Sequence, residues 1–177
     1  MSTKNKKYLY LLRHAKAEKG WPGLDDIDRP LHPVGVDEAH RIATMFGAVT
    51  PIPDMVLSSP SVRTYSTALA FCKTIGFEID QILFDQRIYE ADLKTLMRVI
   101  SEIPNEVDSV LLVGHNPSTT QMANYFHGDI AHMSTSSLIG FSLQLDEWMH
   151  FDIANAQLVC RFTPLTFHVS QILNLSK

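Results

Sequence analysis

Tyr8-Leu9-Tyr10-Leu11-Leu12-Arg13-His14 is the most informative stretch of the sequence. Five consecutive apolar residues predict a short strand that is buried on both faces of a parallel sheet, because such a strand has no solvent side and so no polar alternation. Two further apolar runs, Met55–Ser58 and Ser109–Val113, have the same character. The sequence therefore indicates a sheet whose central strands are parallel.

Segments with helical spacing separate these strands, as in proteins that cover both faces of a sheet with helices. A polar segment, Lys19–Pro33, is expected to form a long loop, and loops of that length are commonly functional. We predict an α/β fold, a three-layer α/β/α sandwich with a mostly parallel, partly mixed sheet, in a single domain covering residues 1–177. The expected helices are Val36–Phe46, Ser61–Ile75, Leu93–Ile103 and Ser118–Phe126. Further extended segments are expected at Ile79–Phe84, Leu138–Leu145 and Gln157–Phe162, whereas the pattern after Thr163 is ambiguous.

The composition is that of an ordinary globular protein, with 45% hydrophobic and 19% charged residues in a chain of 177. A formal net charge of −4 argues against a broad surface for nucleic acid or acidic membrane. Cys72 and Cys160 lie in apolar stretches and are expected to be buried free thiols. No apolar run is long enough for a membrane span, and the start shows no signal-peptide pattern, so we expect a cytoplasmic protein.

Polar residues follow each of the three buried strands. Arg13-His14 follows the first strand, Ser58-Ser59-Pro60 with Arg63 follows the second, and Gly114-His115-Asn116-Pro117 follows the third. Ligands in open α/β sheets bind outside the carboxyl ends of the strands. If the three strands are neighbours, two arginines and two histidines meet at one pocket.

That set of side chains suits phosphoryl transfer. Guanidinium groups match phosphate oxygens in geometry and offset the charge of the transition state. A neutral imidazole is a competent nucleophile near neutral pH, and its attack divides hydrolysis into formation and breakdown of a phosphohistidine. Each residue alone has a simpler structural interpretation. Their recurrence at three strand ends favours a functional one.

The same residues resemble the motifs of the histidine phosphatase superfamily, which has the phosphoglycerate mutase-like fold. The matches run in order from about Leu9 to Pro117, and Thr135-Ser136-Ser137 extends the pattern. His32 and Pro33 depart from the usual residues of the second motif. The short chain is most similar to the SixA-type phosphohistidine phosphatase branch. The motifs are Leu11–Glu18, Arg29-Pro30-Leu31 with Gly35 and Ala39, Ser58–Thr64 and Leu112–Pro117.

The resemblance implies that His14 is the nucleophile and that Arg13, Arg63 and His115 bind the phosphoryl group. Many relatives also use a carboxylate to protonate the leaving oxygen, and Glu90 is the candidate here. The alternative is that Glu90 is a polar residue before the helix and has no catalytic role. Asp92 is expected to cap the helix that begins at Leu93. No cofactor and no metal are expected, because the remaining histidines lack the spacing of a zinc site.

The leading hypothesis is a metal-independent phosphatase acting on a phosphorylated substrate, plausibly a phosphohistidine-containing protein. One alternative is a phosphomonoesterase for a small metabolite such as a sugar or nucleoside phosphate. The other is a non-catalytic module that binds a phosphorylated ligand. The sequence does not distinguish the substrates, because no specificity loop is recognisable in it.

Overall fold

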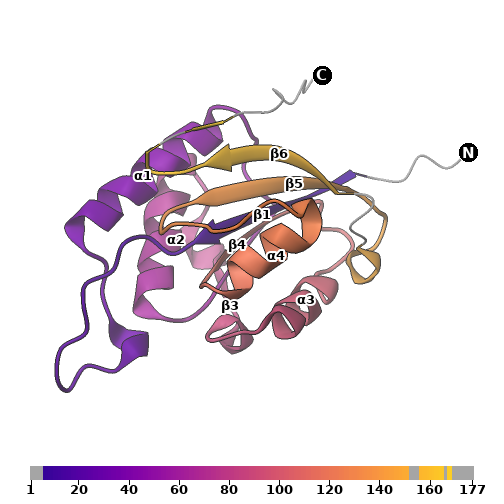
Figure 1. Cartoon of the computed structure of the whole chain (residues 1–177). Helices are drawn as coiled ribbons and strands as arrows, with labels where there is room; N and C mark the ends of the chain where they lie inside the picture. The colour runs from indigo at the N-terminus through magenta and orange to yellow at the C-terminus, as the bar shows by residue number, and fades with distance from the viewer. Residues whose placement is uncertain (1–5, 152–155, 166, 169–177) are drawn as a thin grey trace, which may run out of the picture.

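The computed structural model describes residues 6–151, 156–165 and 167–168. They form one seven-stranded sheet in the order β3-β2-β4-β1-β5-β6-β7 (Figure 1). Neighbouring strands from β3 to β1 are parallel, and those from β1 to β7 are antiparallel. The strands are β1 (Lys6–Arg13), β2 (Met55–Ser58), β3 (Leu83–Phe84), β4 (Ser109–Gly114), β5 (Leu138–Gln144), β6 (Ala156–Phe162) and β7 (Phe167–His168).

Helices cover both faces of the sheet, so the predicted α/β/α sandwich with a mixed sheet is confirmed (Figure 1). Alternate residues of one strand point to opposite faces. Leu9 and Leu11 of β1 pack toward α3 and α4, whereas Tyr10 and Leu12 pack toward α1 and α2. The helices are α1 (Pro33–Gly47), α2 (Val62–Ile75), α3 (Leu93–Ser101) and α4 (Ser118–His127).

The predicted starts of α2 and α3 lie within one residue of the observed ones. Asp92 accepts a hydrogen bond from the backbone N–H of Thr95 at 2.7 Å, and so caps α3 as expected. Ser61 caps α2 in the same way. The helix expected from Val36 instead begins at Pro33, because the Nδ1 atom of His32 accepts from the N–H of Val34 and provides the cap.

Two expectations of extended or loop structure were partly wrong. The segment Ile79–Phe84 is a 3₁₀ turn, η2 (Ile79–Gln81), before the two-residue strand β3. The long loop also contains the 3₁₀ turn η1 (Asp26–Asp28). The ambiguous segment after Thr163 includes β7, and most of the remainder lies outside the described residues.

Two other sequence predictions bear on the molecule as a whole. Cys72 and Cys160 are buried free thiols, as expected. No helix in the described part of the chain has the length and apolar character needed to cross a membrane.

One glycine sets the distance between α1 and the chain that follows β1. A Cβ atom on Gly35 would lie 2.2 Å from the carbonyl oxygen of Lys16, so only a residue without a side chain allows this approach. The backbone N–H of His32 donates to the same carbonyl at 2.9 Å. The start of α1 therefore packs directly against the segment that follows His14.

Candidate active site

The three strands that end in polar residues are neighbours in the sheet. β4 lies between β1 and β2 and is parallel to both, so the carboxyl ends of the three strands meet at one edge. The backbone N–H of His14 donates to the carbonyl of Gly114 at 3.0 Å, and that of Ser59 donates to Val113 at 3.1 Å. Main-chain hydrogen bonds therefore hold the three strand ends together.

The imidazole of His14 has a defined tautomer. Its Nδ1 lies 2.8 Å from the carbonyl oxygen of Ala15, which can only accept, so Nδ1 carries the proton and Nε2 carries the lone pair. The pKa of His14 is lowered to about 4, mainly by burial. The bond to Ala15 opposes this shift, and the charges of Arg63, Arg13 and Arg29 add to it. The ring is therefore neutral at pH 7, with Nε2 free to attack an electrophile.

The second imidazole lies next to the first. The ring centroids of His14 and His115 are 5.3 Å apart, and Nε2 of His115 is 2.8 Å from Oγ of Ser59. Burial lowers the pKa of His115 to about 3, with His14 and Arg63 contributing in the same direction. Its buried Nδ1 has no hydrogen-bond partner in the described part of the structure. Tyr89 packs edge-on against this ring at 5.7 Å.

The guanidinium group of Arg13 has one hydrogen-bonded nitrogen and one buried nitrogen without a partner among the described residues. Its Nη1 donates to the carbonyl of Met133 at 2.7 Å, which also accepts from Nδ2 of Asn116 at 3.0 Å. Its buried Nε has no partner among the described residues. Burial lowers the pKa of Arg13. Buried polar groups in folded proteins are almost always hydrogen-bonded, so the two unpaired nitrogens, on Arg13 and His115, are candidate contacts for a bound ligand.

Arg63 is held by a residue from the long loop. Its Nη2 donates to Oδ2 of Asp26 at 2.8 Å, and its Nη1 donates to the backbone carbonyl of the same residue. The carboxylate of Asp26 also accepts from Nη1 of Arg29 at 2.9 Å and from the hydroxyl of Tyr89 at 3.1 Å. The hydrogen bond from Arg29, followed by the bond and charge of Arg63, lowers the pKa of Asp26 to about 2, although burial opposes this shift.

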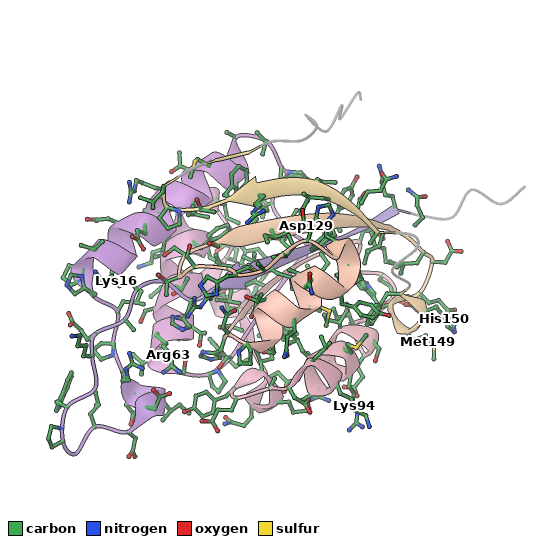
Figure 2. All side chains as sticks on the ribbon, in the orientation of Figure 1. Lys16, Arg63, Lys94, Asp129, Met149 and His150 are labelled. Atoms are coloured by element: carbon green, nitrogen blue, oxygen red, sulfur yellow. The ribbon has the colours of Figure 1, made fainter. Side chains whose placement is uncertain are left out.

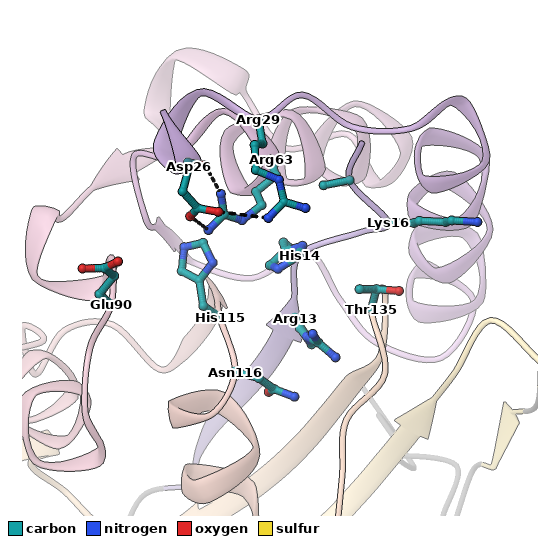
Figure 3. A pocket seen from close by; sticks show the side chains of 11 residues that line it. Arg13, His14, Lys16, Asp26, Arg29, Arg63, Glu90, His115, Asn116 and Thr135 are labelled. Carbon is teal, nitrogen blue, oxygen red and sulfur yellow. Dashed lines mark hydrogen bonds and ion pairs between the residues drawn. The ribbon is translucent and has the colours of Figure 1, made fainter. Parts of the chain in front are cut away.

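These side chains surround a single pocket of about 410 Å³ (Figure 3). The five residues proposed from the sequence all line it. The others are residues for which the sequence argument gave no role or only a minor one. The lining residues are Arg13, His14, Lys16, Ala17, Asp26, Arg29, Arg63, Glu90, His115, Asn116 and Thr135.

Asp26 is the residue that the sequence argument missed. It lies 37 positions before Arg63, in a loop whose conformation no local pattern specifies. The available signal was its place three residues before Arg29, inside the loop already expected to be functional. Arg29 was noted as part of a motif, but not as a pocket residue.

Glu90 lines the pocket on the side of His115 that faces away from His14 (Figure 3). Its φ of 55° lies in the left-handed region, which non-glycine residues rarely adopt. The side chain is exposed. Backbone strain of this kind is common at functional sites but does not assign a role, so Glu90 stays a candidate.

The remaining basic side chains are arranged differently. Lys16 contributes to the pocket wall, but its chain extends away from the two imidazoles (Figure 3). His32 caps α1, and His40 contacts the hydroxyl of Thr74 at 2.7 Å; neither lines the pocket. His150 lies at the opposite end of the molecule from Arg63 (Figure 2). Within the described ranges, no group of three or more His, Cys, Asp or Glu side chains is placed to hold a metal ion.

Comparison with known proteins agrees with the geometry. The model of the histidine phosphatase superfamily (branch 1) matches residues 9–111. An uncharacterised protein of Mycobacterium leprae is 27% identical over 165 residues, which cover 86% of this chain and 99% of that protein.

Solved structures give the same result. A candidate phosphohistidine phosphatase, SixA from Agrobacterium tumefaciens, is 30% identical, with a TM-score of 0.76 over 89% of this chain and 98% of that one. A SixA protein histidine phosphatase in complex with tungstate shares the fold, with a TM-score of 0.74 at 21% identity over 89% of this chain and 97% of that one. The strand-end residues, the pocket they form and the family match over more than half of the sequence lead to one conclusion: this chain belongs to the histidine phosphatase superfamily.

Proposed function

We propose that this chain is a phosphatase whose nucleophile is Nε2 of His14. The observation that carries the proposal is the hydrogen bond from Nδ1 to the carbonyl of Ala15, which leaves the lone pair on Nε2. In the first step Nε2 bonds to phosphorus and the bond to the leaving group breaks. Water then attacks the phosphohistidine, releases inorganic phosphate and restores the free imidazole.

Arg13, Arg63 and His115 bind the phosphoryl group in this proposal. Nε of Arg13 is a buried donor without a partner among the described residues. Nδ1 of His115 is a second such donor in the tautomer in which the hydroxyl of Ser59 donates to Nε2, and phosphoryl oxygens would accept from both. Arg63 keeps further N–H groups beyond the two bonded to Asp26, because a guanidinium has five. Fixed positive charge at the equatorial oxygens supplies the stabilisation that other phosphatases obtain from metal ions, so the reaction is proposed to be metal-independent.

The proposed substrate is a protein that carries phosphohistidine. The similarity to the SixA structure at 30% identity supports it. The open pocket supports it too, because the side chains at its mouth, including those of Asp26 and Glu90, are exposed rather than covered. A phosphorylated side chain on a folded protein can enter such a site from solvent. A small metabolite phosphatase is the second candidate, because the same open pocket also admits a free phosphate ester.

The test measures phosphate release from a phosphohistidine-bearing protein and from sugar and nucleoside phosphates. His14→Ala is expected to abolish release from every substrate, and His127→Ala, which changes an exposed histidine, is expected to leave it intact. Tungstate binding by calorimetry should persist in His14→Ala, because the other anion ligands remain. Full turnover by this variant would refute the nucleophile assignment. Binding without turnover by the unmodified chain would identify a non-catalytic module.

A further inference from the structure

Asp26 connects two arginines at the pocket. Its Oδ1 accepts from Arg29 at 2.9 Å, and its Oδ2 accepts from Arg63 at 2.8 Å and from the hydroxyl of Tyr89 at 3.1 Å. A carboxylate offers about four acceptor positions, so about one remains for another donor. Asp26 is therefore both fixed in place and able to accept one more hydrogen bond.

Asp26 lies at the mouth of the pocket rather than at its base. Its side chain is 51% exposed, whereas the Arg63 side chain beneath it is 8% exposed. His14 and His115 lie deeper, at the strand ends (Figure 3). In phosphoryl transfer the attacking and leaving atoms are roughly in line with phosphorus. A phosphoryl group attacked by His14 from the base therefore expels its leaving group toward the mouth, where Asp26 lies.

The carboxylate is ionised in this setting. The bonds from Arg29 and Arg63 lower its pKa to about 2, so it carries no proton at neutral pH. An ionised carboxylate can accept a hydrogen bond but cannot protonate a departing oxygen. Asp26, at the mouth of the pocket, can therefore accept a hydrogen bond from a leaving group that carries an N–H, but it cannot protonate the oxygen of a departing alcohol.

We propose that Asp26 is a specificity-determining residue that accepts a hydrogen bond from the distal ring N–H of a departing imidazole. The inference rests on the proposed phosphohistidine substrate and assigns a chain residue to its recognition. As the P–N bond breaks, its electron pair stays on the ring nitrogen, and phosphorus bonds to Nε2 of His14. The substrate ring reacts in its protonated form, in which the nitrogen that is not bonded to phosphorus carries the N–H that Asp26 accepts. The imidazole then leaves as a neutral molecule and takes no proton from the enzyme. A phosphate ester of an alcohol gains nothing from the same contact, because its oxygen needs a proton that Asp26 lacks.

The test compares two substrates in three proteins. The substrates are a phosphohistidine-bearing protein and p-nitrophenyl phosphate, whose leaving group is stable without protonation. The proteins are the unmodified chain, Asp26→Asn and Asp28→Asn, a matched control that removes the same charge from an exposed position on the same turn. Asp26→Asn should lose at least about tenfold more in kcat/KM on phosphohistidine than on p-nitrophenyl phosphate, the effect of one charge-assisted hydrogen bond, because any effect through Arg63 is common to both substrates. Asp28→Asn should change less than about twofold on both.

Each other outcome overturns the inference in a recognisable way. Equal losses on the two substrates would show that Asp26 acts only by positioning Arg63. Unchanged turnover of phosphohistidine would show that the carboxylate does not meet the leaving group. If the unmodified chain releases no phosphate from phosphohistidine, the proposed substrate fails and this inference fails with it. If the unmodified chain does release it and Asp26→Asn shows no selective loss, only the inference fails.

Discussion

Replacing His14 with asparagine should make the folded protein less sensitive to acid. Burial lowers the pKa of His14 to about 4 in the folded state, against about 6.5 for an unhindered histidine. Between these values the unfolded chain binds a proton that the folded chain excludes, so stability falls as the pH falls through this range. At pH 5, about 1.5 pH units below the unfolded value, the loss is about 2 kcal/mol at about 1.4 kcal/mol per unit. Below pH 4 the folded protein also binds the proton, and the loss stops growing.

The assay is urea denaturation at pH 7.5 and pH 5, followed by the fluorescence of the buried Trp148. The quantity of interest is the drop in the free energy of unfolding between the two pH values. His14→Asn should reduce that drop by about 2 kcal/mol relative to the unmodified chain. His127→Asn, an exposed control, should leave it unchanged. If His14→Asn and the unmodified chain show the same drop within about 0.5 kcal/mol, the imidazole takes up protons freely in the folded state and the argument for a neutral nucleophile is wrong.

Four further outcomes are expected. Arg63→Ala should lower kcat/KM by about 10²–10³. The control Arg87→Ala, which changes an exposed arginine paired with Asp85 and Glu102, should change kcat/KM less than about threefold. Similar effects of the two substitutions would show that Arg63 does not bind the phosphoryl group. If Glu90 is the general acid, Glu90→Gln should slow hydrolysis of alkyl phosphates more than that of p-nitrophenyl phosphate. Equal rates for the unmodified and variant proteins would show that Glu90 has no catalytic role. Gly35→Ala should destabilise the chain by about 1–3 kcal/mol in the same urea assay, because its Cβ would overlap the Lys16 carbonyl, and an unchanged midpoint would contradict the close approach. Dialysis against EDTA should leave turnover intact, and activity restored only by an added divalent cation would refute metal independence.

Much of the fold could be predicted from the sequence because its signals are local. Continuous apolar runs identified the buried strands, and capping residues such as Asp92 fixed helix ends. The polar residues after three strands predicted which segments meet, because parallel strands that are neighbours must end at one edge. The roles of His14 and the other pocket residues remain predictions.

The parts that could not be predicted depend on contacts between distant segments. Nothing near Asp26 indicates that its carboxylate meets Arg63, because that contact depends on how the loop folds over α2. The 3₁₀ turn at Ile79–Gln81 is similar: the residues of Ile79–Phe84 fit one strand as well as a turn before a strand, and pairing with β2 decides where the strand begins. The left-handed backbone at Glu90 also has no signal in the residue type.

The partner that orients His14, the proposed nucleophile, is a peptide carbonyl, that of Ala15, rather than an acidic side chain. Catalytic triads use a third residue for this purpose, and its replacement lowers kcat by about 10⁴-fold. Here no substitution can delete the orienting group, since every amino acid supplies the same main-chain oxygen. A saturation mutagenesis screen for inactive variants should therefore identify the proposed nucleophile and the residues that bind the phosphoryl group, but no separate orienting residue. The same screen on a hydrolase with a catalytic triad would identify one.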